Sequence, residues 1–245
     1  MERLCIAKSP IDCITFSKAV SQVITEADRG AEFKYVVTPN VDHIVRSFHD
    51  EHLQSIYKNA FLSLCDSRVF AFLARLKGYP IKEVVTGSDL TERVVDNLSA
   101  VEKKITIIGG SECEIKTIKR KYGIAELFHY NPPMGFIFKE EEVNRCVEFV
   151  VNHPSDLVFL AVGSPQQERL AYRISLDSRS RGLGLCIGAS FRFLAGTEKR
   201  APKYLSDIGL EWLFRLWNDP KRLWRRYFRD LYIFYLMIFR VRRYR

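Results

Sequence analysis

Polar side chains that can do acid–base or sugar-binding chemistry follow two short apolar runs of this sequence. Thr38 and Asn40 follow KYVV in the segment TPNVDH, and Asp66 follows FLSLC. A carboxylate near a reacting centre can act as a general base toward a hydroxyl group, and hydroxyl and amide groups can hold a sugar. A plainer interpretation is that Asn40 and Asp66 cap the helices that come next. The residues alone leave both interpretations open.

Three other segments have the glycines and small polar residues of loops that bind phosphate or ribose. They are TGSDL at 86–90, ITIIGG with Gly109 and Gly110, and VGSPQQE with Gly163, Pro165, Gln167 and Glu168. Backbone N–H groups at the start of a helix can bind a phosphate. The spacings GxGxxG and GxxxxGK[ST] do not occur, so the sequence gives poor support to a nicotinamide cofactor or a P-loop.

The sequence has no recognisable set of metal ligands. It contains no DxD pair and no CxxC pair, and its five histidines are scattered. We therefore expect neither a bound metal nor a cofactor. If the substrate is a nucleotide diphosphate, the negative charge of its leaving group would have to be met by arginine or backbone N–H groups. The six cysteines, which lack metal spacing, favour free thiols in a reducing, cytoplasmic protein.

The elements that must position these residues alternate along the chain. Short apolar runs such as KYVV, FLSLC, ITII, LVFLAV and LGLCI are typical of buried strands. Between them, helical spacing predicts helices over residues 41–59, 90–101, 112–122, 140–152 and 166–180. This alternation predicts an α/β fold with a mostly parallel sheet covered on both faces. Ligands of such sheets bind at the carboxyl ends of the strands, which is where the polar residues stand.

The C-terminal segment differs in charge from the rest of the chain. Residues 199–245 hold 13 of the 38 Lys and Arg residues but only 4 of the 29 Asp and Glu residues, which leaves 25 of each before them. The formal charge of +9 therefore lies entirely in this segment. We expect an α/β core over 1–200 and a helical appendage over 201–245, with a polyanion as the partner of the appendage.

Asn218-Asp219-Pro220 predicts that one helix stops and another starts, since Asp219 can cap the second helix and Pro220 suits its first position. The second helix is amphipathic. Its apolar face carries Trp224, Tyr227, Phe228 and Leu231, and its opposite face carries Arg222, Arg225, Arg226 and Arg229. Such a helix is typical of a membrane interface, but it can equally pack on its own core with a solvated basic face. Residues 231–239 would be buried in protein or placed among lipid headgroups. No apolar run reaches the roughly 20 residues of a spanning helix, and the N-terminus lacks the features of a signal peptide.

Together these segments resemble the WecG/TagA/CpsF glycosyltransferases. The resemblance runs from about residue 34 to residue 230, and its most specific part is GASFRFLAGTEKRAP followed by GLEWLFRL and DPKRLWRRY. It implies a Rossmann-like core. It also implies inverting transfer of a sugar from a nucleotide diphosphate, such as a UDP-sugar, to a polyprenyl-diphosphate-linked acceptor. The place would be the anionic inner face of the bacterial plasma membrane, and no metal would be obligatory.

The resemblance also implies roles for the residues above. Asp66 matches the catalytic base, and Thr38 and Asn40 match residues of the reaction pocket. Gly163, Pro165, Gln167 and Glu168 match the nucleotide-side loop, and Arg215, Arg222 and Arg225 match arginines of a membrane-docking lid that reaches the diphosphate. The rival hypothesis is a non-enzymatic protein that binds nucleic acid through its basic segment. The apolar run at 231–239 favours the enzyme, because a helix that faces RNA has little use for it.

Three departures from the family pattern bear on substrate choice. Cys65-Asp66-Ser67 stands where Pro-Asp-Gly is common, Val84 replaces an arginine, and Arg192 replaces an aspartate. With the segment NPPMGF at 131–136, these departures favour an exopolysaccharide member over the teichoic-acid or enterobacterial-antigen members.

Overall fold

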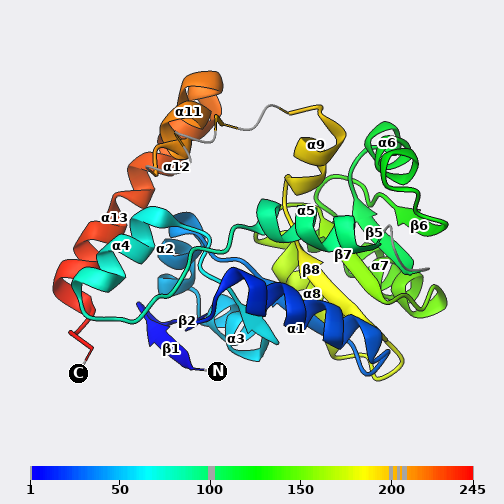
Figure 1. Ribbon diagram of the computed structural model, residues 1–245, viewed down its shortest axis with the longest axis horizontal. Coiled ribbons are helices and arrows are strands. Elements are labelled where there is room, and N and C mark those ends of the chain that lie inside the picture. The colour runs from blue at the N-terminus through cyan, green and yellow to red at the C-terminus, as the bar shows by residue number, and fades with distance from the viewer. Residues whose placement is uncertain (1, 99–102, 199–200, 203–204, 206–208, 245) are drawn as a thin grey trace.

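One six-stranded parallel sheet forms the centre of the molecule (Figure 1). The computed structural model describes residues 2–98, 103–198, 201–202, 205 and 209–244, apart from the side chains of Leu98 and Arg222. In spatial order the strands are β4 (Leu62–Ser63), β3 (Lys34–Val37), β8 (Leu183–Cys186), β7 (Leu157–Ala161), β5 (Lys104–Gly109) and β6 (Glu126–Tyr130). The predicted α/β class and parallel sheet are confirmed. Every strand pair in this sheet is parallel.

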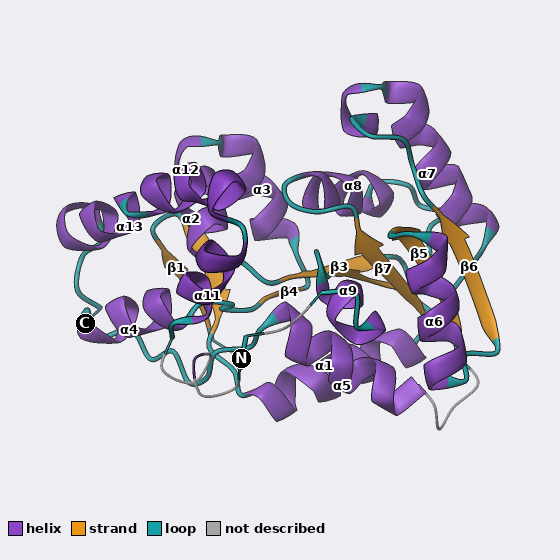
Figure 2. Ribbon diagram, turned by 90° about the horizontal axis from the view of Figure 1, so that it is seen from above, coloured by secondary structure: helices purple, strands orange, loops and turns teal. Residues whose placement is uncertain are grey.

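Helices cover both faces of the sheet, as Figure 2 shows. On one face lie α1 (Phe16–Asp28), α5 (Gly87–Leu98), α6 (Glu112–Tyr122) and α9 (Ser190–Ala195). On the other lie α3 (Glu51–Asn59), α7 (Glu140–Asn152) and α8 (Gln166–Ser175). Because both faces are covered, the strands are apolar almost throughout; Val158, Phe159 and Leu160 of β7 are fully buried.

The helix expected over residues 41–59 is two helices. Asp50 ends α2 (Val41–His49) and begins α3, with extended backbone angles and a side chain that accepts the Leu53 N–H at 3.0 Å. An aspartate with this capping geometry interrupts a pattern whose apolar spacing is otherwise continuous. The apolar pattern also did not predict α1, α4 (Arg68–Leu76) or β6. Helix α8 ends at Ser175, earlier than the expected residue 180.

A third apolar cluster lies beyond the β4 edge of the sheet. It joins a hairpin of β1 (Arg3–Ile6) and β2 (Ser9–Asp12) to α2, α4 and the C-terminal end of the chain. Ile233, Leu236 and Met237 are buried in it at 1 %, 0 % and 1 % exposure. Of the two sequence interpretations of residues 231–239, burial in protein therefore holds for one side of this segment.

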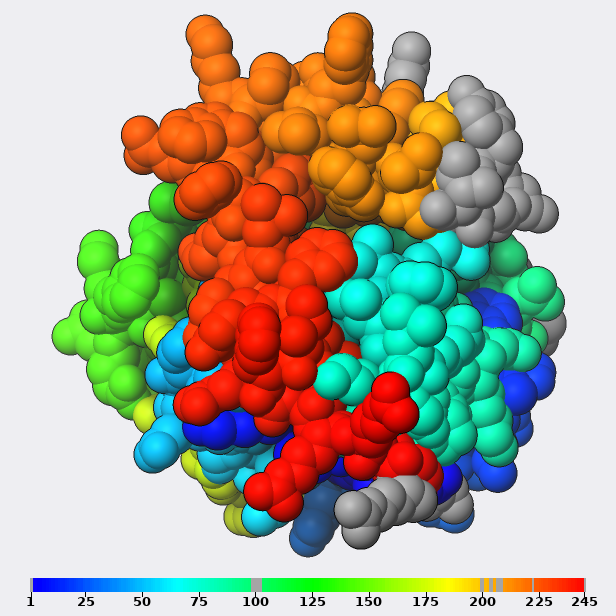
Figure 3. Space-filling model, turned by 90° about the vertical axis from the view of Figure 1, so that its left-hand side faces the viewer, coloured from blue at the N-terminus to red at the C-terminus, as the bar shows by residue number. Residues whose placement is uncertain are grey.

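The C-terminal helices are α11 (Glu211–Asn218), α12 (Pro220–Asp230), α13 (Tyr232–Tyr235) and η2 (Leu236–Arg240), the last a turn of π-helix. The expected helix break is confirmed, with Asp219 at the N-cap and Pro220 at the first helical position. Figure 3 shows these helices crossing one face of the molecule beside the segment that contains α4. Among the described residues, no helix combines the length and apolar character that a membrane crossing requires.

Candidate active site

Asp66 and Thr38 meet at the carboxyl ends of the neighbouring strands β4 and β3. The Asp66 carboxylate accepts the Gly87 N–H at 3.0 Å, at the first residue of α5. A Cβ atom on Gly87 would lie 2.8 Å from Thr38 Oγ1 and 3.6 Å from Asp66 Oδ2, so glycine is what lets these two side chains approach the helix end. From β3 the chain passes to β4 on one side of β3, and from β4 it crosses to β5 on the other side of β3. Ligands of such sheets bind at the strand ends where the strand order reverses in this way.

The sequence offered capping as the alternative role of Asp66, but another residue caps the helix that follows. Ser67 is the N-cap of α4, and its hydroxyl accepts the Phe70 N–H at 3.1 Å. Asn40 does cap its helix, because its side chain accepts the His43 N–H at 3.4 Å while its own N–H donates to His43 Nδ1 at 3.2 Å. Asn40 nevertheless lines the same cavity as Asp66, so capping and pocket positions coincide there.

The Asp66 carboxyl is poised to exchange a proton near neutral pH. Burial raises the pKa of Asp66 to about 7, against the opposing effects of the Gly87 hydrogen bond and of the Arg215 charge. Glu211 and Asp89 raise that pKa further. A general base works best when its pKa lies near the working pH, and Asp66 meets that condition.

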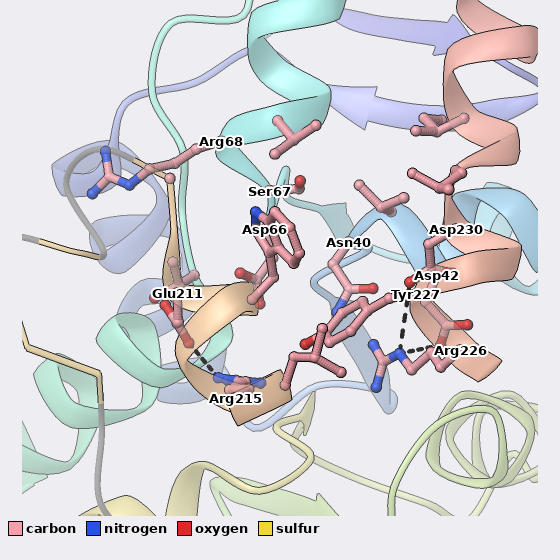
Figure 4. A pocket seen from close by; sticks show the side chains of 18 of the residues that line it. Asn40, Asp42, Asp66, Ser67, Arg68, Glu211, Arg215, Arg226, Tyr227 and Asp230 are labelled. Atoms are coloured by element: carbon pink, nitrogen blue, oxygen red, sulfur yellow. Dashed lines mark hydrogen bonds and ion pairs between the residues drawn. The ribbon is translucent and has the colours of Figure 1, made fainter. Parts of the chain in front are cut away.

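Asp66 lines a cavity of about 570 Å³ between the core and the C-terminal helices (Figure 4). The polar lining from the core includes Asn40, Asp42, Asp66, Ser67, Thr86 and Ser88. The apolar lining is supplied mostly by the C-terminal helices: Trp212, Leu216, Trp224, Tyr227, Phe228, Leu231, Ile233 and Phe234. The lining of the cavity therefore combines charged and polar groups with apolar side chains, which suits an amphiphilic ligand.

Two arginines of the C-terminal helices also line this cavity. Arg215 of α11 pairs with Glu211 and stacks over the Phe193 ring of α9, with its guanidinium carbon 5.5 Å from the ring centroid. Arg226 of α12 lies 3.4 Å from Asp42 Oδ2 and 3.8 Å from Asp230 Oδ2. Figure 4 shows Arg215 and Arg226 on either side of Tyr227. Cationic groups that converge on one cavity can bind the phosphate groups of a ligand.

A buried ion cluster fixes α12 to the core. Asp42 at the start of α2 is 3 % exposed at its side chain and pairs with Arg46, Arg226 and Arg229. Burial raises the pKa of Asp42, but the Arg226 and Arg46 charges outweigh burial and hold that pKa below its ordinary value. By contrast, burial and the nearby Asp42 charge raise the pKa of Asp230 to about 7. We call these five residues the Asp42 cluster.

The VGSPQQE turn lies at the ends of the adjacent strands β7 and β8, outside the lining of the 570 Å³ cavity. Gly163 has a φ of +80°, and Pro165 stands at the N-cap of α8. Gln167 accepts the Gly188 N–H at 2.8 Å and donates to Glu168 at 2.9 Å. Both side chains are nearly fully buried, and Glu168 Oε2 has no hydrogen-bond partner among the described residues.

The GG loop is farther along the same sheet edge. Gly109 ends β5 with a φ of +94°, and a Cβ atom there would lie 2.7 Å from Val162, so the close approach of β7 requires glycine. Gly110 also has a positive φ and leads into the Ser111 cap of α6. Neither glycine lines the cavity around Asp66.

The arginines expected from the sequence do not all face the cavity. Arg215 lines it, whereas Arg225 is exposed and stacks on Trp224 at 5.4 Å. The side chain of Arg222 lies outside the described residues. Arg226 and Tyr227 do line the cavity and were not proposed for the site. Helical spacing placed Arg226 on the basic face, but only its pairing with Asp42 shows that it turns inward.

No three His, Cys, Asp or Glu side chains come together as metal ligands in the part of the chain that the structure describes.

Two comparisons with known proteins show which family this chain belongs to. Residues 4–245 match the family described as "Glycosyl transferase WecG/TagA/CpsF family". A relative from Bacillus spizizenii, named N-acetylglucosaminyldiphosphoundecaprenol N-acetyl-beta-D-mannosaminyltransferase, is 25 % identical over 217 residues, which cover 86 % of this chain and 80 % of the relative. The family match, over residues 4–245, includes the strand-end residues and the C-terminal helices. The chain therefore belongs to the WecG/TagA/CpsF family and is a glycosyltransferase.

Proposed function

We propose that this protein transfers a sugar, with inversion, from a nucleotide diphosphate to a saccharide linked to polyprenyl diphosphate. The observation that carries the proposal is the cavity that the Asp66 carboxyl, with a pKa of about 7, lines together with Arg215, Arg226 and many apolar side chains. The related Bacillus enzyme is named for N-acetylglucosaminyl-diphosphoundecaprenol as acceptor, and we propose the same acceptor here. The departures at Cys65, Val84 and Arg192 favour a place in exopolysaccharide synthesis.

Asp66 serves as the general base. The acceptor hydroxyl gives its proton to the Asp66 carboxylate while its oxygen attacks the anomeric carbon of the donor. The bond from that carbon to the diphosphate breaks on the opposite face, and the nucleoside diphosphate leaves with the bonding electrons. Thr38 and Asn40 hold the reacting sugars, since Thr38 lies beside Asp66 at Gly87 and Asn40 lines the cavity.

The donor nucleotide binds along the strand ends next to the cavity. The loops at Gly109–Gly110 and Gly163–Glu168 supply backbone N–H groups close to helix starts there. Arg215 and Arg226 offset the charge of the diphosphate groups, which supports turnover without a bound metal or cofactor. Arg222 and Arg225 remain candidates for the same role when the enzyme is on the membrane.

The C-terminal helices bring the enzyme to the anionic inner face of the plasma membrane. Exposed aromatic side chains there include Trp217, Trp224, Phe228 and Phe239, at 85 %, 53 %, 73 % and 71 % exposure. Arginines lie among them, which is the composition of a helix at a lipid interface. The membrane, rather than nucleic acid, is thus the polyanionic partner that we propose.

The test is transfer by the purified protein onto N-acetylglucosaminyl-diphospho-polyprenol, assayed with a panel of nucleotide sugars in detergent. We expect one donor to give a product whose new linkage is inverted relative to that donor, with turnover that persists in chelator. A retained linkage, or no transfer from any donor of the panel, would contradict the proposal.

A further inference from the structure

A second pocket, of about 350 Å³, lies between the N-terminal hairpin and the C-terminal end of the chain. Its lining is Cys5, Ala7, Lys8, Phe48, Tyr79, Arg240, Val241 and Arg242. Three of these side chains are cationic and none is acidic. None of the eight residues lines the cavity around Asp66, so the pocket has no part in the chemistry proposed above.

The hairpin turn holds Lys8 at this pocket. Ile6 pairs with Ser9, so Ala7 and Lys8 are the two turn residues, and both have positive φ values, +49° and +61°. Asparagine and glycine are the usual residues in such a turn, and side chains like these occupy it at an energetic cost. The Lys8 ammonium group lies 4.9 Å from the centroid of the Phe48 ring.

The chain end that supplies the two arginines is tied down at several points. The Tyr244 N–H donates to the Lys77 carbonyl at 2.9 Å, and the Tyr79 hydroxyl donates to the Arg242 carbonyl at 3.2 Å. Val241, between the arginines, is 7 % exposed in the third apolar cluster. The backbone that presents Arg240 and Arg242 is thus fixed beside Lys8 before any ligand arrives.

The three cations have no acidic partner among the described residues. Lys8, Arg240 and Arg242 take part in no described ion pair, whereas Arg46, Arg226 and Arg229 all pair with Asp42. Glu2, the acid at this end of the chain, accepts the Tyr244 hydroxyl at 2.6 Å instead. Like charges held close together repel, and an anion between them removes that repulsion. A phosphate group matches three such donors.

The surroundings of the pocket indicate which kind of molecule would supply such a phosphate group. Phe239 and Ile238, at 71 % and 58 % exposure, directly precede Arg240, and Leu76 of α4 is 64 % exposed. The Lys77 ammonium donates to the Ile238 carbonyl at 3.2 Å, so the end of α4 and η2 are joined. Apolar side chains next to a cationic pocket fit a lipid, whose tails and phosphate lie at adjacent depths.

We propose that Lys8, Arg240 and Arg242 form a binding site for the phosphate of an anionic phospholipid headgroup. The site rests on the proposed membrane docking and makes it specific: the C-terminal helices insert apolar side chains, and this pocket selects anionic lipid and fixes the orientation of the enzyme. It also gives the N-terminal hairpin a role at the membrane.

Vesicle binding by full-length variants tests the site. Lys8→Gln and Arg242→Gln remove pocket charges, and Arg243→Gln is the matched control, since Arg243 is exposed, adjacent and outside the pocket lining. On phosphatidylcholine vesicles with about 30 mol % phosphatidylglycerol, the pocket variants should bind on the order of tenfold or more weakly, as expected for lost charge-assisted hydrogen bonds. The control should lose no more than about fivefold, the effect of one surface charge. On pure phosphatidylcholine all four proteins should bind alike.

Equal losses for Arg242→Gln and Arg243→Gln would mean that only total charge matters, and would overturn the site. Folding is checked by the thermal midpoint, and Arg240→Gln replaces any variant whose midpoint falls. Transfer onto a short-chain acceptor in detergent should be unchanged in the pocket variants. An inactive wild-type protein would therefore count against the proposed function while vesicle binding still decides the site.

Thiol chemistry separates lipid from soluble phosphate. Cys5 lines the pocket and Cys113 lies elsewhere on the surface, and both are exposed. Anionic vesicles should slow alkylation of Cys5 but not of Cys113, and more than neutral vesicles do. Protection of Cys5 by inorganic phosphate alone, with no difference between the variants on vesicles, would assign the pocket to a soluble phosphate and reject the lipid.

Discussion

Arg226 of α12 lies 3.4 Å from the Asp42 carboxylate of α2, and this ion pair joins the C-terminal helices to the strand-bearing core. The same arginine lines the cavity that Asp66 faces. A single side chain thus helps to hold α12 in place and presents positive charge to the proposed diphosphate site. Docking of the C-terminal helices and completion of the candidate active site are therefore physically coupled.

Asp42→Asn should loosen α12 and reduce activity together. The change leaves Arg46, Arg226 and Arg229 without their shared carboxylate, and we expect a loss of about 2 kcal/mol in the free energy of unfolding, since the arginines are partly exposed. Hydrogen exchange should accelerate in α12 and stay unchanged in α7. Glu141→Gln is the control, because it also replaces a carboxylate by an amide and Glu141 is exposed and outside the cavity lining. Undisturbed exchange in α12 would show that the Asp42 cluster does not anchor it.

Asp66→Asn should lower kcat by about two to four orders of magnitude with little change in the thermal midpoint, since the amide cannot accept the acceptor proton. Steady-state kinetics in detergent measures the effect. Glu141→Gln is a suitable control, as Glu141 is exposed on α7, far along the chain from the cavity lining. Retained turnover in Asp66→Asn would remove Asp66 from the role of base.

The pH dependence of kcat/KM should show an acid limb near pH 7, because Asp66 must be ionised to accept a proton and its pKa is about 7. The Arg215 charge lowers that pKa and the Glu211 charge raises it. The limb should therefore move to higher pH in Arg215→Gln and to lower pH in Glu211→Gln, with no movement in Arg225→Gln. Shifts in the same direction for both cavity variants would contradict this assignment.

The stability gained by Asp230→Asn over the wild-type protein should be larger at pH 8 than at pH 4.5. The pKa of Asp230 is about 7 in the folded protein and near the ordinary value of 3.8 in the unfolded chain, so the folded state binds more protons between those pH values. The wild-type protein therefore loses stability from this group as pH rises toward 7, and the variant does not. Urea unfolding at both pH values gives the difference between the two proteins. A difference that is independent of pH would show that Asp230 is ionised normally.

Phe239→Ser should weaken vesicle binding on the order of tenfold, because the exposed ring would otherwise be buried in lipid. Phe138→Ser is matched to it, with a ring that is 81 % exposed in η1 (Phe136–Phe138) next to α7. Figure 1 shows α7 and α13 at opposite ends of the molecule. Vesicle flotation measures binding, and similar losses for both variants would argue against a defined docking face.

The sequence alone determined five of the six strands of the parallel sheet and the loops that follow them. Buried parallel strands are continuous apolar runs, and the polar residue after each run is a local feature, so Thr38, Asp66 and Gly163 could be placed at strand ends from the pattern. The charge imbalance and the helix break at Pro220 were equally local. Strand β6 was missed because its segment ELFHY starts with Glu126 and contains His129, so it is not a continuous apolar run, and because it lies half-buried at the edge of the sheet.

Only the tertiary structure decided which of these residues share a cavity. The strand order β4-β3-β8-β7-β5-β6 brings Asp66 next to Thr38 but sets the Gly163 turn on other strands, and no sequence pattern carries that order. The inward turn of Arg226 depends on Asp42, 184 positions earlier in the chain, and the cationic pocket combines Lys8 with Arg240 and Arg242. Periodicity reports how a residue faces within its own helix or strand, whereas pairing across the chain depends on how the elements pack against one another.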